Sequence, residues 1–372
     1  MERVVMPPGR VIIDLWQAVR SSVLKAGRSM IEIDGSHGEG GGQILRTALA
    51  LSSHLGMPFR MYHIRRGRAR PGLMPQHLVA VRAAQHLSRA EVSGDSKGST
   101  ELSFIPHGVA GGEFSFDIGT AGSTTLVLQT LIPALLFCGE KSRVTILGGT
   151  HVPFSPSYHY LAEVFAPFLR RLGAEIRLGI DSYGFYPRGG GRVRAEIRPA
   201  GRLVPLNAAE RGRLVRLAGS SAVGNLPLSI AERQKDALLA TLLPGIPPGS
   251  PVRIELHSVS TPSTGTFLFL RAETEQSMAG FTALGARGKR AEAVGEEAAR
   301  EFLAYYGAEA ALDPHLADQI VLYLALCGGS SVFTTSAITR HLLTNLWVIG
   351  LFHEFRYRID GELGEPGTVV IN

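Results

Sequence analysis

The fold of this chain is decided near its start by the stretch Ile31-Glu32-Ile33-Asp34-Gly35-Ser36-His37-Gly38-Glu39-Gly40-Gly41-Gly42-Gln43-Ile44-Leu45-Arg46. A short alternating strand runs into a loop with five glycines in the eight residues 35–42, and an apolar helical pattern follows. Glycine permits positive φ and close backbone approach, so such a loop can bring several N–H groups up to phosphate oxygens. The helix start adds a positive dipole end. With Glu39 and Arg46 in the same element, the stretch suits a metal-bound polyphosphate.

The glycine pattern alone also fits a tight turn. The stretch is not a Walker A sequence, because no Gly-Lys-Ser/Thr follows, and its glycines do not match the usual register of the dinucleotide fingerprint. Phosphate binding and a tight turn are therefore equally well supported by these residues alone.

A second strand–loop–helix pattern repeats the first. Twelve residues separate Asp34 from Arg46, and twelve separate Asp117 from Gln129, with a glycine-rich turn after each aspartate. A third version is predicted around Leu326-Cys327-Gly328-Gly329 with a helix at 341–352, although its spacing differs. These copies favour a core built from repeated α/β units, and chance similarity between common units is the alternative.

The order of predicted strands and helices changes between about 204 and 309. Here we predict a strand at 213–223, a helix at 229–243, a β pair at 252–259 and 266–272, and a helix at 290–306. We therefore expect an inserted β-α-β-β-α domain at 204–309 within an α/β (α+β) core formed by 30–203 and 310–372. Residues 1–29 are interpreted as an N-terminal extension, because they lack the long apolar core of a secretory signal.

The composition restricts the class of protein. Of the 372 residues, 45% are hydrophobic and 19% are charged, which excludes a mostly disordered chain. The net charge of +6 favours a polyanionic partner. No apolar run is long enough for a membrane span, so we expect no membrane partner. The two cysteines, Cys138 and Cys327, lie in apolar runs and are interpreted as buried reduced thiols, which favours a cytoplasmic location.

Basic residues concentrate in the segment Arg65-Arg66-Gly67-Arg68-Ala69-Arg70-Pro71-Gly72, and Gln76 follows. Four arginines on a loop form a candidate phosphate cradle, from which we select Arg65, Arg70 and Gln76 as RNA- or phosphate-binding residues. A solvated surface turn is an equal alternative. No aromatic residues are interleaved, so base stacking by this segment is not indicated.

His341 stands out among the histidines, because it begins a predicted helix. A histidine beside the positive end of a helix dipole loses basicity, which favours its neutral, nucleophilic form. Taken alone, a structural role for this residue is favoured over a catalytic one.

Together these segments closely resemble the RNA 3′-terminal phosphate cyclase family. The resemblance runs from about residue 30 to the C-terminus and rests on five segments. They are the run from Ile33 to Arg46, the segment Gly67-Arg68-Ala69-Arg70-Pro71-Gly72-Leu73, the stretch Gly119-Thr120-Ala121-Gly122-Ser123-Thr124-Thr125-Leu126-Val127-Leu128-Gln129-Thr130, the triplet Gly189-Gly190-Gly191 and His341-Leu342-Leu343-Thr344-Asn345. The family fold implies three repeated β-α-β-α-β-β units, like those of enolpyruvyl transferases, and an inserted domain of four strands and two helices.

The resemblance also implies an activity. Members of the family are ligases that use ATP and a divalent metal, Mg²⁺ or Mn²⁺, to convert an RNA 3′-phosphate end to a 2′,3′-cyclic phosphate, through a histidine–AMP adduct and an RNA(3′)pp(5′)A intermediate. His341 matches the family nucleophile, Glu39 the metal-holding carboxylate, and Arg46 and Arg68 the arginines around the phosphates. The residues that match the nucleotide pocket are Gln129, Pro156, His315, Leu316, Ala317, Asp318 and Gln319. Some relatives place tyrosine where His315 stands, and an imidazole can also stack on adenine.

Three other interpretations remain. A non-catalytic cyclase-like ribosome-biogenesis protein would lack the nucleophilic histidine, which is present here as His341. An enolpyruvyl transferase would need two comparable halves and no large insertion, and a plain RNA-binding module leaves the Glu39 loop unexplained. The sequence leaves open the physiological RNA, the preferred metal, the role of the insertion and the oligomeric state, for which a homodimer is one option.

Overall fold

The structure is a computed structural model, and it describes residues 29–372. The predicted N-terminal extension lies outside the described residues except for Ser29. Within the described range, no helix combines the length and the apolar character needed to cross a membrane.

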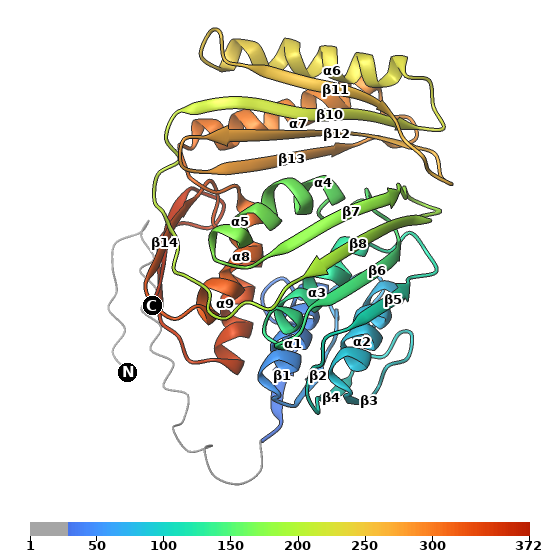
Figure 1. Cartoon of the computed structure of the whole chain (residues 1–372), viewed down its shortest axis with the longest axis vertical. Helices are drawn as coiled ribbons and strands as arrows, with labels where there is room; N and C mark the ends of the chain where they lie inside the picture. The colour runs from blue at the N-terminus through green and yellow to red at the C-terminus, as the bar shows by residue number, and fades with distance from the viewer. Residues whose placement is uncertain (1–28) are drawn as a thin grey trace.

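Three units share the order strand–helix–strand–helix–strand–strand (Figure 1). The first comprises β1 (Ile31–Asp34), α1 (Gly42–Leu55), β2 (Phe59–Tyr62), α2 (Pro75–Ser88), β3 (Glu91–Ser93) and β4 (Leu102–Ile105). The second comprises β5 (Glu113–Asp117), α3 (Thr124–Leu136), β6 (Ser142–Gly148), a helix formed by α4 (Tyr158–Tyr160), a π-helical turn (Leu161–Phe165) and α5 (Ala166–Arg171), then β7 (Ile176–Ser182) and β8 (Gly191–Ile197). The third comprises β9 (Asn207–Ala208), α8 (Pro314–Leu326), β14 (Ser331–Thr335), α9 (Arg340–Phe352), β15 (Tyr357–Gly361) and β16 (Gly367–Ile371). The prediction of a repeated α/β core is confirmed.

The sheets of the three units have the same topology. Their strand orders are β1-β2-β4-β3, β5-β6-β8-β7 and β9-β14-β16-β15. In each, the first two strands are parallel, and the last two form an antiparallel pair. Parallel neighbours need a crossover connection, which α1, α3 and α8 supply.

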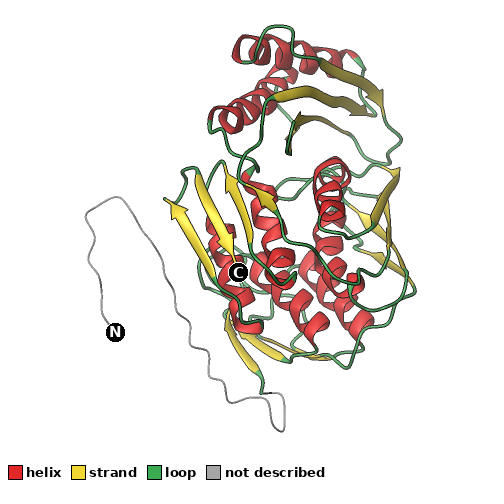
Figure 2. Ribbon diagram, turned by 60° about the vertical axis from the view of Figure 1, so that its left-hand side comes forward, coloured by secondary structure: helices red, strands yellow, loops and turns green. Residues whose placement is uncertain are grey.

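The helices of the three units face one another in the middle of the core, with the sheets on the outside (Figure 2). Helix α1 packs against α2, α3 and α9, and α8 packs against α9. All residues of α3 except Gln129 are buried, as expected for a helix that is apolar all round. Gln129 is therefore the one α3 residue that is not buried, and it lines the cavity described below.

A fourth unit forms the upper part of the molecule in Figure 1. It comprises β10 (Leu214–Gly224), α6 (Ser229–Leu242), a 3₁₀ turn (Leu243–Gly245), β11 (Val252–Ser258), β12 (Gly265–Thr274), β13 (Met278–Leu284) and α7 (Ala291–Gly307). Its sheet has the order β11-β10-β12-β13, and it has an apolar cluster of its own between the sheet and the two helices. This unit has the four strands and two helices that the resemblance implies.

Two sequence predictions for this unit were wrong in detail. The strands at 252–258 and 265–274 were expected to pair, but β10 lies between them, parallel to β11 and antiparallel to β12. The pattern also missed β13, which pairs with β12 and packs against α7. The local sequence of a short strand does not show which strand it pairs with, because pairing is decided by non-local contacts.

The insertion interrupts the third unit between its first strand and its first helix. Strand β9 lies inside the predicted 204–309 range, yet it pairs with β14 of the third unit. We therefore propose that the inserted domain begins after Ala208. The third repeat was predicted at Gly328-Gly329, but this turn connects α8 to β14 and does not follow the unit's first strand. The true equivalent was split by the insertion, so no continuous window of sequence contains it.

Asp313 joins three parts of the molecule at the start of α8. Its buried carboxylate accepts hydrogen bonds from the Tyr160 hydroxyl at 2.7 Å, from Leu316 N at 2.9 Å and from Gly280 N of β13 at 3.4 Å. It thereby serves as the N-cap of α8 and ties this helix to the second unit and to the inserted sheet. Burial raises the pKa of Asp313 above its usual range. This joint fixes the position of α8, which carries several predicted site residues.

Gly295 on α7 provides a test of how closely α6 and α7 pack. A Cβ there would lie 2.1 Å from the Gln234 carbonyl oxygen and 2.8 Å from Leu238 N, both on α6. We expect Gly295→Ala to destabilise the protein by about 1–3 kcal/mol, because the helices must separate. In the same helix, a Cβ at Gly307 meets nothing within 4 Å. Gly307→Ala should be neutral or stabilising by about 0.5–1 kcal/mol. Urea unfolding followed by circular dichroism measures both, and equal midpoints for the two variants would contradict the packing.

Candidate active site

The glycine loop after β1 lies against α9 of the third unit. Glu39 N donates to Thr344 Oγ1 at 3.4 Å, and the His37 ring stacks on Trp347 with centroids 3.8 Å apart. Gly38 has a φ of 57°, and a Cβ on it would lie 2.5 Å from Thr344 Oγ1. Glycine at this position therefore serves a close approach between two units.

The glycine pattern suggested a row of free amides facing a ligand, but five amides of the loop already have protein acceptors. The N–H groups of Gly35, Ser36, His37, Glu39 and Gly40 all donate to protein oxygens. What the loop offers to the cavity is mainly the side chain of Glu39. Internal hydrogen bonds thus already use the donors of residues 35–37 and 39–40, and a phosphate contact by the other amides of the loop stays a prediction.

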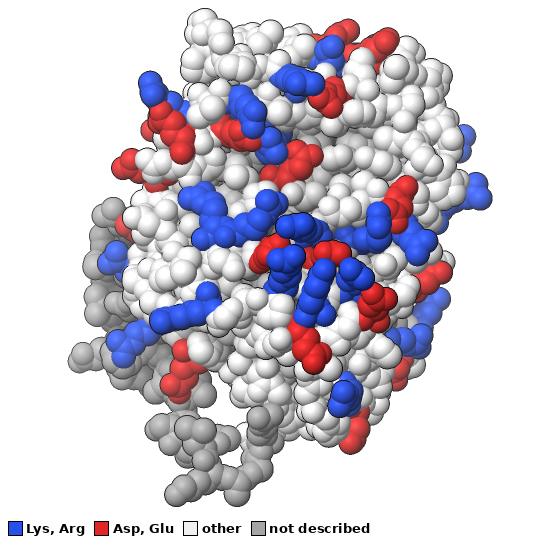
Figure 3. All heavy atoms as spheres, in the orientation of Figure 1, with Lys and Arg blue, Asp and Glu red and all other residues white. Residues whose placement is uncertain are grey.

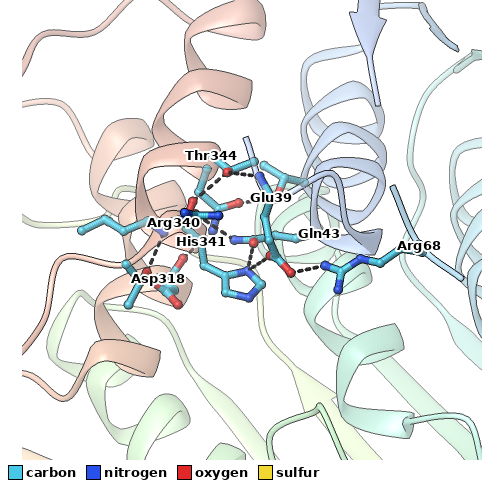
Figure 4. Close-up of polar contacts among 11 residues, drawn as sticks. Glu39, Gln43, Arg68, Asp318, Arg340, His341 and Thr344 are labelled. Atoms are coloured by element: carbon cyan, nitrogen blue, oxygen red, sulfur yellow. Dashed lines mark hydrogen bonds and ion pairs between the residues drawn. The ribbon is translucent and has the colours of Figure 1, made fainter. Parts of the chain in front are cut away.

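Glu39 lies between His341 and Arg68 (Figure 4). Its Oε2 is 2.8 Å from His341 Nδ1, and its Oε1 accepts from the guanidinium of Arg68. The same His341 nitrogen contacts Gln43 Oε1, and Gln43 Nε2 donates back to the His341 carbonyl at 3.1 Å. A loop residue and a residue of α1 therefore hold the Nδ1 edge of the imidazole that α9 carries.

The basicity of His341 differs from the sequence prediction. Contact with His341, with a further contribution from Arg68, lowers the pKa of Glu39 to about 2 against the opposing effect of burial. In return, Glu39 raises the pKa of His341 above its ordinary value. The prediction that the helix start makes His341 less basic was wrong. His341 does lie in the first turn of α9, but a carboxylate at 2.8 Å outweighs a helix dipole.

Asp318 anchors the start of α9 to α8. Its Oδ1 accepts from Thr339 Oγ1 at 2.5 Å, and its carbonyl oxygen accepts from Asn345 Nδ2 at 2.6 Å. Thr339 is in turn the N-cap of α9, accepting from Leu342 N at 2.9 Å. Burial raises the pKa of Asp318 to about 7. This network fixes the helix turn that carries His341.

These residues open onto a cavity of about 760 Å³, a volume within the usual range for ligand sites. All three core units and the inserted domain contribute to its lining, the last through Gly280, Thr282 and Glu301. Of the predicted site residues, the lining includes Glu39, Arg46, Arg65, Arg68, Gln76, Gln129, Pro156, His315, Asp318, Gln319 and His341. Residues widely separated in sequence are thus brought to one place, while their individual roles remain predictions.

Three predicted site residues lie elsewhere. Leu316 and Ala317 are fully buried in the main hydrophobic core, so their side chains do not face the cavity. They lie on the inner side of α8, whereas His315, Asp318 and Gln319 lie toward the cavity, since helical neighbours point in different directions. Arg70 is exposed and outside the lining, and its carbonyl accepts from Arg65 Nη1 at 2.9 Å.

The cavity wall is positively charged. Arg46 remains cationic at neutral pH, although burial lowers its pKa to about 10. Burial, Arg46 and Arg65 together lower the pKa of His77 to about 3, so this ring is neutral. On the face shown in Figure 3, by contrast, Lys and Arg gather across the middle with Asp and Glu among them. Arginines of β6 and β8, outside the cavity lining, pair with carboxylates, as in Arg143–Glu196 and Arg194–Asp181. The net charge alone therefore did not locate the site.

Sequence reasoning did not select many of the residues that line the cavity, and four of them bear on its chemistry or its shape. Gln43 follows Glu39 by four residues across the helix start, a spacing that could have suggested a shared partner. Tyr160 and Phe154 flank the predicted Pro156, but neither has a pattern that marks it. Glu301 comes from the inserted domain, and burial raises its pKa to about 7. No local signal connects it to the core.

Comparison with known proteins gives one consistent family. Residues 37–359 match the family model described as RNA 3′-terminal phosphate cyclase. The RNA 3′-terminal phosphate cyclase of Pyrobaculum neutrophilum is 44% identical over 331 residues, which cover 89% of this chain and 95% of that protein. That of Ignicoccus hospitalis is 45% identical over 341 residues, covering 91% and 97%. A solved EPSP synthase from Acinetobacter baumannii aligns with 61% of this chain and 57% of its own at 11% identity and a TM-score of 0.23, a likeness too weak to support a conclusion.

Replacing the carboxylate beside His341 should change the titration of its ring. We expect Glu39→Gln to lower the pKa of His341, because the substitution removes the main group that raises it and leaves burial and Arg46, which lower it. The measurement is an NMR titration of the imidazole resonances in nucleotide-free protein. The remaining histidines serve as internal controls, with His341→Ala assigning the signal. An unchanged or higher pKa for His341 would contradict the geometry.

Proposed function

Because the chain belongs to the RNA 3′-terminal phosphate cyclase family, we propose that it uses ATP to convert RNA 3′-phosphate ends to 2′,3′-cyclic phosphates. One observation carries this proposal: His341 is held through Nδ1 by Glu39 and Gln43 on the wall of an arginine-lined cavity. That arrangement leaves Nε2 as the ring nitrogen able to attack a bound phosphate.

The first step is adenylation of His341. Nε2 attacks the α-phosphorus of ATP, a P–N bond forms, and the P–O bond to pyrophosphate breaks. Arg46, Arg65 and Arg68 are placed to neutralise the phosphate charges, the usual task of guanidinium groups in phosphoryl transfer. The imidazole gains positive charge as the bond forms, and the carboxylate of Glu39 beside Nδ1 stabilises it.

Two further steps lead to the product. A 3′-phosphate oxygen of RNA attacks the adenylate phosphorus, and the P–N bond breaks to regenerate His341. The adjacent 2′-hydroxyl then attacks the 3′-phosphorus and expels AMP. The intermediate is needed because a dianionic phosphate is a poor electrophile with a poor leaving group, whereas AMP leaves readily. The 2′-hydroxyl is already adjacent, so its high effective concentration favours ring closure.

We place the adenosine of ATP between Pro156 and His315, which both line the cavity. The nearby Gln129 Nε2 donates to Gln319 Oε1 at 2.6 Å, so these two amides are oriented together on that wall. The His315 ring meets Tyr160 edge-on at 6.4 Å between centroids. An imidazole at position 315 supplies a smaller stacking surface than the tyrosine of some relatives.

A divalent cation fits this site through one protein ligand. Within residues 29–372, no group of three or more His, Cys, Asp and Glu could hold a metal ion unaided. Glu39 Oε2, however, is buried and makes no hydrogen bond of good geometry. Mg²⁺ commonly takes one or two carboxylates and completes its shell with substrate phosphates and water, which suits Glu39. When bound, the cation would neutralise phosphate charge.

The other candidate functions receive less support. A non-catalytic cyclase-like protein is the main alternative, and the held imidazole of His341 argues against it. The cytoplasmic location and the homodimer considered from the sequence stay predictions.

Labelling with ATP carrying a radioactive α-phosphate should yield a protein–AMP adduct in the presence of Mg²⁺. Because a phosphoramidate links them, the adduct should be labile in acid and stable in alkali. His341→Ala should abolish labelling. His257→Ala, which changes a half-exposed histidine on β11 outside the cavity, should label like the parent protein. Labelling that persists in His341→Ala would refute the nucleophile assignment.

The complete reaction should protect RNA ends from phosphatase. We expect an RNA oligonucleotide with a labelled 3′-phosphate to become resistant after incubation with the protein, ATP and Mg²⁺ or Mn²⁺. An otherwise identical oligonucleotide with a terminal 2′-deoxyribose should stop at the adenylated (3′)pp(5′)A end and form no cyclic phosphate, because it lacks the hydroxyl that closes the ring. Failure with every common metal would favour the non-catalytic alternative.

A further inference from the structure

Phe154 combines two features that are each unfavourable for a phenylalanine. Its side chain is fully exposed, with a relative accessibility of 103%. Its φ is 62°, in the left-handed region that bulky side chains rarely adopt. Neither the exposed ring nor the strained backbone of Phe154 stabilises the described part of the chain. Backbone strain of this kind concentrates at functional sites.

The position of Phe154 indicates a role for its exposed ring in binding. The residue lies between β6 and α4, and it lines the cavity although its ring is in solvent, which places it at the mouth. Pro156, two residues further on, is the predicted adenine contact deeper inside. An aromatic face at the mouth is therefore available to a second, larger substrate rather than to ATP.

The loop that carries Phe154 is firmly attached on both sides. Ser155 Oγ donates to the Val152 carbonyl at 2.9 Å, and the Pro156 carbonyl accepts from Thr125 Oγ1 at 2.7 Å. Ser157 Oγ lies 2.9 Å from Thr282 Oγ1 of the inserted domain. The ring is thus presented by a braced turn, and a flat ligand that stacks on it meets a preorganised surface.

We propose that Phe154 is the stacking platform for a base at the 3′ end of the RNA substrate. This inference rests on the proposed function and deepens it. A base has a π-face whatever its identity, so stacking on Phe154 binds the end without reading its sequence. The arginines of the cavity wall can meanwhile receive the terminal phosphate, which must pass the mouth to reach His341.

The test measures RNA binding directly. The probe is a short RNA with a 3′-phosphate and 2-aminopurine as its terminal base, added to the full chain without ATP at fixed salt. Anisotropy of a 5′ dye reports affinity, and quenching of 2-aminopurine reports stacking. Phe154→Ala should weaken binding by roughly 5- to 150-fold, the range for loss of one base–aromatic stack, and should reduce the quenching. Phe154→Trp and Phe154→Tyr should retain both signals.

Leu243→Ala is the matched control, because Leu243 is also an exposed apolar residue, 51% accessible, and lies outside the cavity lining. Its RNA affinity should equal that of the parent protein. If Phe154→Ala binds RNA as the parent does, the platform is refuted while the proposed function stands. A change in sedimentation with unchanged RNA affinity would instead assign Phe154 to a contact between copies of the chain. If the parent protein does not bind the probe, the RNA substrate of the proposed function fails, and the platform fails with it.

Discussion

The geometry of the candidate site depends on one carboxylate that contacts both an imidazole and a guanidinium. Glu39 lies between the imidazole of His341 and the guanidinium of Arg68, and each of the three comes from a different segment of the chain. The contact lowers the pKa of Glu39 and raises that of His341, so an ionised carboxylate holds the imidazole through Nδ1 before any ligand enters. The site is therefore electrostatically preorganised, and it exists only when the first and third units are packed together.

The packing of α1 on α9 provides that condition. Thr47 Oγ1 of α1 donates to Asn345 Oδ1 of α9 at 2.8 Å, and the same asparagine binds the Asp318 carbonyl. These buried hydrogen bonds fix how the two helices lie along each other, since a shift would leave polar groups unpaired. The backbone of the glycine loop can then approach the side chain of Thr344 on α9 closely at Gly38. Its glycines serve the contact between units more than they serve contacts with a ligand.

The second unit and the inserted domain complete the cavity rather than the catalytic group. The second unit contributes Gln129, Pro156 and Tyr160 to the lining, and the inserted domain contributes Gly280, Thr282 and Glu301. Asp313 links these walls through hydrogen bonds to Tyr160 and Gly280. The inserted domain is thus part of the site although its fold and its apolar cluster are separate.

The sequence by itself determined the local units. The glycine loop between strand and helix, the all-apolar α3 and the changed texture after about residue 204 follow from patterns only a few residues long, and the structure contains the elements that they predict. Nine of the eleven site residues that the family resemblance identified line the cavity. Tertiary structure alone decided the rest. It placed β10 between β11 and β12, it interrupted the third repeat after β9, and it directed Leu316 and Ala317 into the core. It also reversed the expected basicity of His341, because local sequence places a helix dipole beside the ring, whereas only folding brings a carboxylate from the other end of the chain to 2.8 Å.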